Sequence, residues 1–155
     1  MFDEKFLRRA IDLASANIDN GGGPFGAVVV RDGEVIAESG NRVTADHDPT
    51  AHAEVMAIRL AAKKLNDFSL RGCDIYASCE PCPMCLAAIY WARIDNVYYA
   101  ASSSSAAQAG FDDSVIYRQI RLPKQERTVP MRQYLQREGE LPFLKWISTD
   151  SKTEY

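Results

Sequence analysis

Two short stretches of the chain carry residue types that bind metal and move protons. His52 and Glu54 are separated by one residue, and Cys82 and Cys85 are separated by two. A histidine nitrogen and two cysteine thiolates are typical ligands of a catalytic zinc ion, whose fourth tetrahedral position stays open for water. A carboxylate beside such a metal can move protons to and from that water. We therefore interpret the two stretches as a zinc site whose acid and base is Glu54.

Spacing alone leaves the choice of ligands open. Cys79 stands three residues before Cys82 and could pair with it, and either Cys79 or His47 could complete a structural zinc site with four protein ligands. A strand, Cys-x-x-Cys and a helix in series also occur in thioredoxin-like redox proteins. The accompanying His-x-Glu argues against that alternative. A structural histidine beside two buried thiols is the plainer alternative, and we favour the zinc site over it.

Two predicted helices should position these residues. Asp48 and Pro49 suit the cap and the first position of a helix, and this helix should hold His52 in its first turn. Another helix, over about 83–92, begins at the two cysteines. It is apolar nearly all round, which predicts that it is buried. Helices that start at the same edge of a sheet would bring the ligand side chains together, because ligands of α/β proteins usually bind at that edge.

The remaining pattern predicts an α/β fold. Apolar residues at helical spacing indicate a helix over 2–20. Short β-branched or aromatic runs predict strands at 27–30, 35–37, 73–78 and 97–101. Asp32-Gly33 is a hairpin turn, so the first two strands should be antiparallel, whereas the strand–helix–strand unit should be parallel. We therefore expect a three-layer α/β/α sandwich with a mixed sheet.

The segments between and after these elements are less regular. They predict loops at 41–48 and 102–105, a helix over 112–121, a helix around 131–137 and an irregular tail after it.

Composition indicates a single cytoplasmic domain. The chain has 155 residues, of which 46% are hydrophobic and 25% are charged, as in ordinary globular proteins. No apolar run approaches the roughly 20 residues of a membrane span, and the mixed N-terminus is unlike a signal peptide. All four cysteines lie between positions 73 and 85. Such clustering favours metal binding over a secreted disulfide framework.

The charge distribution argues against nucleic acid as the main partner. The net charge is −3, although residues 118–137 carry six basic side chains against Glu126 alone. We interpret this basic stretch as a solvated helical face, with an RNA-contacting patch as the alternative.

The motif and its flanking blocks resemble a known family. The pattern His-x-Glu followed by Pro-Cys-x-x-Cys is the signature of zinc-dependent nucleobase deaminases, and the chain resembles the cytidine and purine deaminase superfamily. Further blocks are similar to the bacterial guanine deaminases of that superfamily. They are GGPFGA at 22–27, DPTAHAE at 48–54, AAIYWAR at 87–93, GFDDS at 110–114 and KTEY at 152–155.

The resemblance implies a fold, a reaction and a set of site residues. The fold would be a cytidine deaminase-like α/β/α sandwich with a mixed five-stranded sheet, in one domain (1–155) whose tail, about 148–155, caps an active site. The reaction would be the hydrolysis of guanine, a purine base, to xanthine and ammonia, with one Zn²⁺ per chain in a homodimer. The metal ligands would be His52, Cys82 and Cys85, and Glu54 would transfer protons.

The base would be held by residues outside the zinc motif. By resemblance, Asn41 would hydrogen-bond the base and Asp113 would meet its polar edge or assist proton transfer. Phe25, Trp91 and Tyr155 would enclose the ring. Each has a plainer interpretation, namely a core aromatic for Phe25 and Trp91, a turn residue for Asn41, a helix cap for Asp113 and a frayed terminus for Tyr155.

Other functions fit the same motif. The substrate could instead be guanosine, cytosine or a triazine amine, or an adenosine in tRNA, which would require a basic groove around the site. A zinc-stabilised binding module is the non-enzyme alternative.

Overall fold

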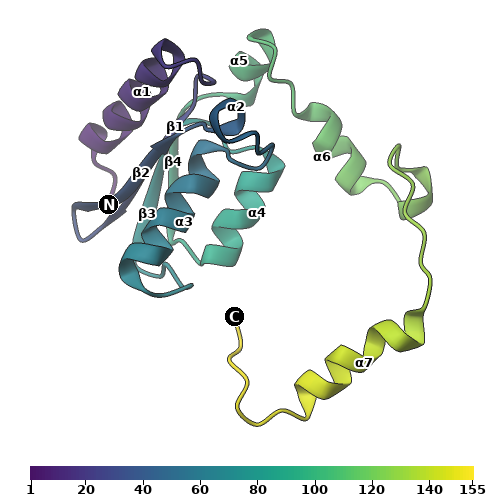
Figure 1. The fold of residues 1–155 in the computed structure, drawn as a ribbon. Helices are drawn as coiled ribbons and strands as arrows, with labels where there is room; N and C mark the ends of the chain where they lie inside the picture. The colour runs from purple at the N-terminus through teal and green to yellow at the C-terminus, as the bar shows by residue number, and fades with distance from the viewer. The chain divides into compact units, whose positions relative to one another are not determined.

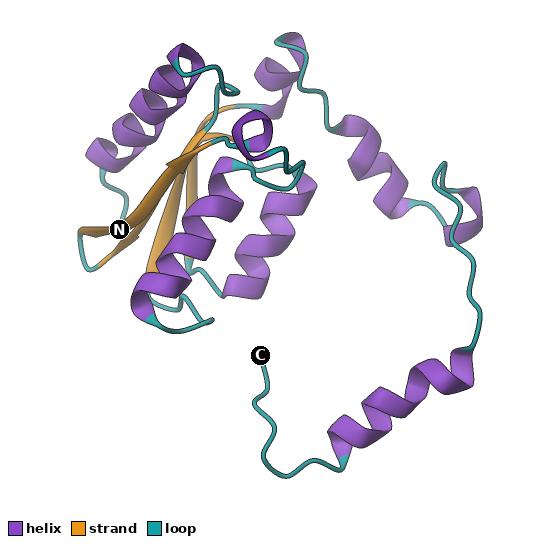
Figure 2. Ribbon diagram, viewed as in Figure 1, coloured by secondary structure: helices purple, strands orange, loops and turns teal.

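The computed structural model describes all residues, 1–155, and divides them into two units, residues 1–114 and 115–155. Figure 1 shows the course of the chain and Figure 2 its helices and strands.

The first unit is built on a four-stranded mixed sheet with the order β2-β1-β3-β4. β1 (Gly26–Arg31) lies antiparallel to both β2 (Glu34–Gly40) and β3 (Cys73–Cys79), and β3 lies parallel to β4 (Asn96–Ala101). The tight turn at 32–33 joins β1 to β2, since Arg31 pairs with Glu34. The predicted hairpin and the predicted parallel crossover are both confirmed.

Helices cover both faces of this sheet, as the ribbon shows (Figure 1). Side chains of a strand alternate between faces, so Val28 and Val30 pack with α1 (Glu4–Asp19) while Val29 packs with α3 (Ala53–Leu65). α4 (Pro83–Ala92) lies beside α3 and adds Ile89 to the same core. The three-layer α/β/α sandwich is therefore confirmed.

The sheet has four strands rather than the five that the resemblance implied. After β4 the chain enters α5 (Ser103–Gln108), whose N-cap is Ser102, where a loop was predicted at 102–105. The Ser102 hydroxyl accepts a hydrogen bond from the Ser105 backbone N–H and caps this helix. No later segment forms a strand.

The helix that follows Asp48 begins later than predicted. Asp48 accepts hydrogen bonds from the backbone and hydroxyl of Thr50, so this segment forms a local turn instead of the first helical turn. α3 starts at Ala53, which makes His52 its N-cap residue. The predicted loop at 41–48 also contains the short helix α2 (Val43–Asp46).

α4 is not buried all round, contrary to the prediction. One face packs on the sheet through Cys85, Ile89 and Ala92, while Tyr90 and Trp91 are 77% and 66% exposed. A helix with apolar side chains on every face is expected to be covered on several sides. In this chain only one side of α4 is covered.

The second unit is helical and has no buried core. It contains α6 (Ser114–Arg121), the 3₁₀ turn η1 (Lys124–Glu126) and α7 (Gln136–Ile147). No residue after Ala92 is buried. The helix predicted around 131–137 was wrong, since α7 begins at Gln136 and continues through Pro142, a residue that usually ends helices. None of the helices of the chain has both the length and the hydropathy of a membrane-spanning segment.

Gly26 lets α1 lie directly on the sheet. A Cβ atom added there would lie 2.4 Å from the Ala10 carbonyl oxygen and 2.8 Å from the Ala14 nitrogen. Because these are backbone atoms of a packed helix, Gly26→Ala should lower the free energy of unfolding by about 1–3 kcal/mol. Urea denaturation measures this. Gly139→Ala is the matched control: a Cβ at Gly139 meets no atom within 4 Å, so it should not destabilise the protein. Equal stability of Gly26→Ala and wild type would contradict the close helix–strand packing.

Candidate zinc-dependent active site

The N-termini of two helices place three metal-binding side chains together. His52 is the N-cap of α3 and Cys82 is the N-cap of α4, and neither side chain makes a capping hydrogen bond to its own helix. Cys85 lies in the first turn of α4. Both helices therefore begin at one edge of the sheet, as the motif required. The ligand atoms of these three residues lie within 4.8 Å of one another.

The geometry of this cluster fits zinc. The Nδ1 atom of His52 lies 3.5 Å from the sulfur of Cys82 and 3.5 Å from the sulfur of Cys85. Zinc bonds of about 2.3 Å to sulfur and about 2.0–2.1 Å to nitrogen, at a tetrahedral angle, separate the two ligand atoms by about 3.6 Å. One nitrogen and two sulfurs at this spacing leave one tetrahedral position, the donor set of a catalytic zinc.

The electrostatics of the cluster favour a thiolate at Cys82. Hydrogen bonds from Cys85 and then from His52 lower the pKa of Cys82 to about 4. The hydrogen bond with Cys82 raises the pKa of His52. The hydrogen bond with Cys82, together with burial, raises the pKa of Cys85. The partial positive charge at a helix N-terminus also stabilises a thiolate. The thiolate is the form of cysteine that binds metal.

The alternative ligands lie outside this group. Cys79 is buried at the end of β3, where its thiol donates to the Ser102 carbonyl oxygen over 3.6 Å. Neither Cys79 nor His47 joins the group of three. The structure thus favours His52, Cys82 and Cys85 among the ligand sets that spacing left open.

Glu54 lies beside the cluster. It occupies the first turn of α3, is 7% exposed, and is close enough to Cys82, Cys85 and His52 to interact with them electrostatically. Burial raises the pKa of this carboxyl group above its ordinary value. Glu54 is thus a buried titratable group held next to the candidate metal ligands.

Asn41 and Phe25 lie together near the start of β1. The Asn41 N–H donates to the Phe25 carbonyl oxygen at 3.0 Å. The side-chain oxygen of Asn41, a residue only 9% exposed, accepts from the Val43 N–H at 3.1 Å. Both side chains surround Gly23, whose added Cβ would lie 3.5 Å from each. The structure therefore brings these two predicted base-binding residues into one small region.

Asp113 is close enough to the cluster to respond to its charge. Partial burial, followed by the negative charge of Cys82, raises the pKa of Asp113. The segment before Asp113 packs back on the site because Phe111 meets Phe25 edge to face, with ring centroids 4.9 Å apart. Glu80, next to the cysteine motif, accepts the Ser103 backbone N–H at 2.9 Å and ties α5 to the site.

Trp91 and Tyr155 were also predicted to enclose the base. Trp91 lies near the C-terminal end of α4 and lines a shallow surface hollow with Ala87, Tyr90 and Arg93. Tyr155 ends the second unit and is 71% exposed. Their roles in substrate binding stay predictions.

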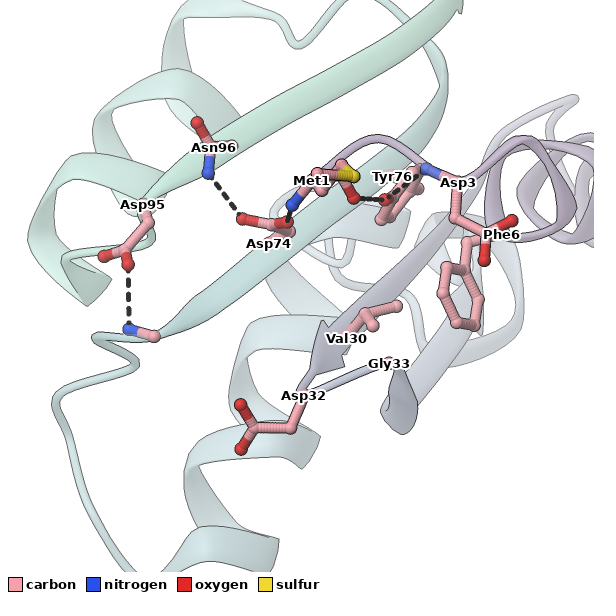
Figure 3. Close-up of a pocket in the computed structure, with 11 residues that line it drawn as sticks. Met1, Asp3, Phe6, Val30, Asp32, Gly33, Asp74, Tyr76, Asp95 and Asn96 are labelled. Carbon is pink, nitrogen blue, oxygen red and sulfur yellow. Dashed lines mark hydrogen bonds and ion pairs between the residues drawn. The ribbon is translucent and has the colours of Figure 1, made fainter.

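A cavity of about 400 Å³ lies at the opposite end of the sheet, where β3 begins (Figure 3). Its polar groups pair among themselves. The carboxylate of Asp74 accepts a hydrogen bond from the Asn96 side chain and forms an ion pair with the N-terminal amine. The Tyr76 hydroxyl accepts a hydrogen bond from the Asp3 backbone N–H and donates one to the Met1 carbonyl oxygen. Asp74 and Tyr76 in this cavity therefore hold the N-terminal residues in place. The cavity does not include any of the candidate metal ligands.

Sequence analysis assigned no role to Phe111, Glu80 or Asn17. Phe111 belongs to a block that resembles the relatives, so its aromatic character next to Asp113 was an available signal. Glu80 precedes the cysteine motif, but its backbone partner Ser103 lies 23 residues away and no local pattern indicates the contact. Asn17 is one of several polar residues near the end of α1.

Comparison with known proteins identifies the family. Residues 1–101 match the cytidine and deoxycytidylate deaminase zinc-binding region. A guanine deaminase of Bacillus subtilis is 54% identical over all of both chains, and its X-ray structure superposes with a TM-score of 0.96, covering 100% of this chain and 99% of that one. A tRNA-specific adenosine deaminase of Aquifex aeolicus is 42% identical over 65% of this chain and 67% of its own length.

A solved guanine deaminase of Nitrosomonas europaea is more distant. It has a TM-score of 0.67 and 33% identity, covering 72% of this chain and 65% of that one. The match to the family's zinc-binding region spans well over half of the chain and includes the three clustered ligands, so this protein belongs to the zinc-dependent cytidine and deoxycytidylate deaminase family.

Proposed function

We propose that this protein is a guanine deaminase, which hydrolyses guanine to xanthine and ammonia. The observation that carries the proposal is the 54% identity with a guanine deaminase over the full length of both chains. The compact group of His52, Cys82 and Cys85 beside buried Glu54 supports hydrolytic chemistry at a zinc ion.

The reaction replaces an exocyclic amine by oxygen. The bond between the base carbon and its amine breaks, and a bond from that carbon to a water oxygen forms. His52, Cys82 and Cys85 would hold a zinc ion, which as a Lewis acid would make water nucleophilic near neutral pH. Glu54 takes a proton from the attacking water and gives it to the adjacent ring nitrogen. It then takes the remaining hydroxyl proton and gives it to the amine, which leaves as ammonia.

Residues around β1 and after α5 would bind the base. The oxygen of the Asn41 side chain is held by Val43, so its amide N–H groups remain as donors for acceptors on the purine. Phe25, held edge to face by Phe111, would stack on the ring. Asp113 would accept from a polar N–H edge of the base or assist proton transfer. Together these groups would distinguish a planar, hydrogen-bonding base from other amines.

We further propose that the protein is a homodimer. The exposed Tyr90 and Trp91 on α4 leave an apolar surface, and the unit 115–155 buries none of its own residues. An apolar surface of this kind is typical of a protein interface. In this arrangement Trp91 would lie where a second chain covers α4. Light scattering should give twice the chain mass, and a monomer at micromolar concentration would contradict the proposal.

The C-terminal tail, about 148–155, would close an active site, in its own chain or in its neighbour, around a single deaminase domain. Deleting Tyr155 should raise KM for guanine about tenfold, because the loss of one stacking contact is worth about 1–3 kcal/mol per base. Steady-state kinetics measure this. Tyr155→Phe retains the ring and should keep the wild-type KM. Unchanged kinetics after the deletion would show that the tail is incidental.

A cytoplasmic location is consistent with the state of the cysteines. All four are free, and two of them need to stay reduced to bind metal. We propose the cytoplasm on this basis.

A tRNA adenosine deaminase is the second candidate. The Aquifex aeolicus relative and the basic residues at 118–137 favour it. The match to that relative covers about two thirds of this chain, and the net charge of −3 argues against a polyanionic substrate.

A substrate panel separates the candidates. The zinc-loaded protein should deaminate guanine with a higher kcat/KM than guanosine, cytosine, a triazine amine or the anticodon arm of a tRNA. Release of ammonia from each substrate is measured, with chelator-treated protein as the blank. Preferential deamination of the tRNA, with binding that weakens steeply as salt rises, would replace the proposal by the second candidate.

A further inference from the structure

Asn17, near the C-terminal end of α1, joins two segments of the candidate base-binding region. Its side-chain nitrogen donates to the Gly23 carbonyl oxygen and to the Asn41 carbonyl oxygen, both at 2.8 Å. An amide NH₂ group has two N–H donors, and here each has an acceptor. One partner lies in the loop before β1 and the other directly follows β2.

Two glycines provide the space that this amide occupies. A Cβ atom at Gly22 would lie 2.3 Å from the side-chain nitrogen of Asn17, and one at Gly40 would lie 2.5 Å from its side-chain oxygen. Neither glycine has a positive φ, so the backbone does not require glycine at these positions. The requirement is steric, and in both cases the obstructing group is Asn17.

The two acceptors belong to the segments that carry Phe25 and Asn41. The Gly23 oxygen also accepts the Phe25 N–H at 2.8 Å, and the Phe25 oxygen accepts the Asn41 N–H at 3.0 Å. Asn17, Gly23, Phe25 and Asn41 therefore form a closed series of hydrogen bonds. Asn17 closes this series without being one of the proposed base-binding residues.

A neighbouring asparagine shows what a purely local role looks like. Asn20 donates to the Ala16 carbonyl oxygen one turn earlier at 2.9 Å and is exposed. Asn17 instead reaches Asn41, which lies 24 residues away. The long-range partner distinguishes a positioning residue from a helix cap.

We infer that Asn17 is a positioning residue for binding of the purine base. Its two hydrogen bonds set the distance between the stacking ring of Phe25 and the amide of Asn41. The inference rests on the proposed function. Because the zinc ligands and Glu54 lie on other elements, loss of Asn17 should weaken substrate binding and leave the chemical step largely intact.

Asn17→Ala tests this through the split between KM and kcat. KM for guanine should rise about tenfold, which corresponds to roughly 1.4 kcal/mol of binding free energy, while kcat changes less than about threefold and zinc stays at one per chain. Asn20→Ala is the matched control and should leave both kinetic constants unchanged. A fall in kcat with unchanged KM, or no change in either, would overturn the inference.

A double-mutant cycle tests the steric part independently. Gly22→Ala should raise KM in the wild type, because the new Cβ displaces the Asn17 amide. In the Asn17→Ala background the obstructing atoms are gone, so the same substitution should have almost no further effect. Additive effects of the two substitutions would overturn the inference.

Activity of the wild-type protein in the same assay separates failure of the proposed function from failure of the role of Asn17. If the wild type does not deaminate guanine, both the proposed function and this inference fail. If the wild type is active and Asn17→Ala retains its KM, the inference alone fails.

Discussion

Glu54→Gln is expected to reduce kcat for guanine deamination by about 10²- to 10⁴-fold, the usual contribution of a general acid and base. The amide has nearly the shape of the carboxylate but cannot accept the proton of the attacking water. Glu54 is only 7% exposed, so solvent cannot readily take its place as the proton carrier. Initial rates of xanthine formation measure the effect.

Zinc content and fold are the controls for this variant. Metal analysis should still find one zinc per chain, and circular dichroism should match the wild type, because Glu54 is not among the three clustered ligands. Glu34→Gln, at an exposed position where β2 begins, should retain full activity. If Glu54→Gln kept wild-type turnover, Glu54 could not be the proton carrier. In a zinc-stabilised binding module, Glu54→Gln would likewise have little effect on function.

Cys82→Ala is expected to abolish both zinc binding and turnover. Even partners in the outer shell of a metal site typically change affinity by about 10–100-fold, and Cys82 is one of the three clustered ligands, with a pKa lowered to about 4 by its hydrogen bonds to Cys85 and His52. We therefore expect a loss of zinc affinity of more than about 100-fold. Competition with a chromogenic zinc chelator measures it.

Cys79→Ala decides between the ligand sets that spacing alone left open. Cys79 is as near in sequence to Cys82 as Cys85 is, but its thiol donates to the Ser102 carbonyl oxygen. This variant should keep its zinc and most of its activity. Loss of zinc from Cys79→Ala, or its retention in Cys82→Ala, would contradict the assigned site.

The framework of the fold could be predicted because its signals are local. The hairpin turn at 32–33, the β-branched strand Gly26–Arg31 and the helical stripe of α1 each lie within a few residues. The number of strands came from the resemblance and was wrong by one. The start of α3 was missed because Asp48 can cap either a helix or a local turn, and here it bonds Thr50 in a turn.

The exposure of α4 could not be predicted from its own sequence. A helix that is apolar all round is expected in a core, yet Tyr90 and Trp91 face outward in one chain. Which face of such a helix the rest of the chain covers depends on tertiary packing, and the sequence of the helix alone does not indicate it. α7 was missed for another reason, since Pro142 within it signals a break that does not occur.

The zinc cluster was predictable from its motif, and the base-binding region was predictable only through resemblance. His52, Cys82 and Cys85 have types and spacings that indicate metal binding by themselves. The bonds from Asn17 to Gly23 and Asn41 span 6 and 24 residues, and they form only when α1 packs on the sheet. Gly22 and Gly40 make room for the Asn17 side chain. The sequence shows these glycines, but the reason for them becomes clear only from the folded structure.

The most direct test of the account is the product stoichiometry with guanine. Zinc-loaded protein is incubated with guanine, and xanthine and ammonia are quantified over time by chromatography and by a coupled ammonia assay. The two products should appear at a ratio of about one to one, and both should form about 10²- to 10⁴-fold more slowly with Glu54→Gln. No xanthine from guanine, under conditions in which the protein releases ammonia from another amine, would contradict it.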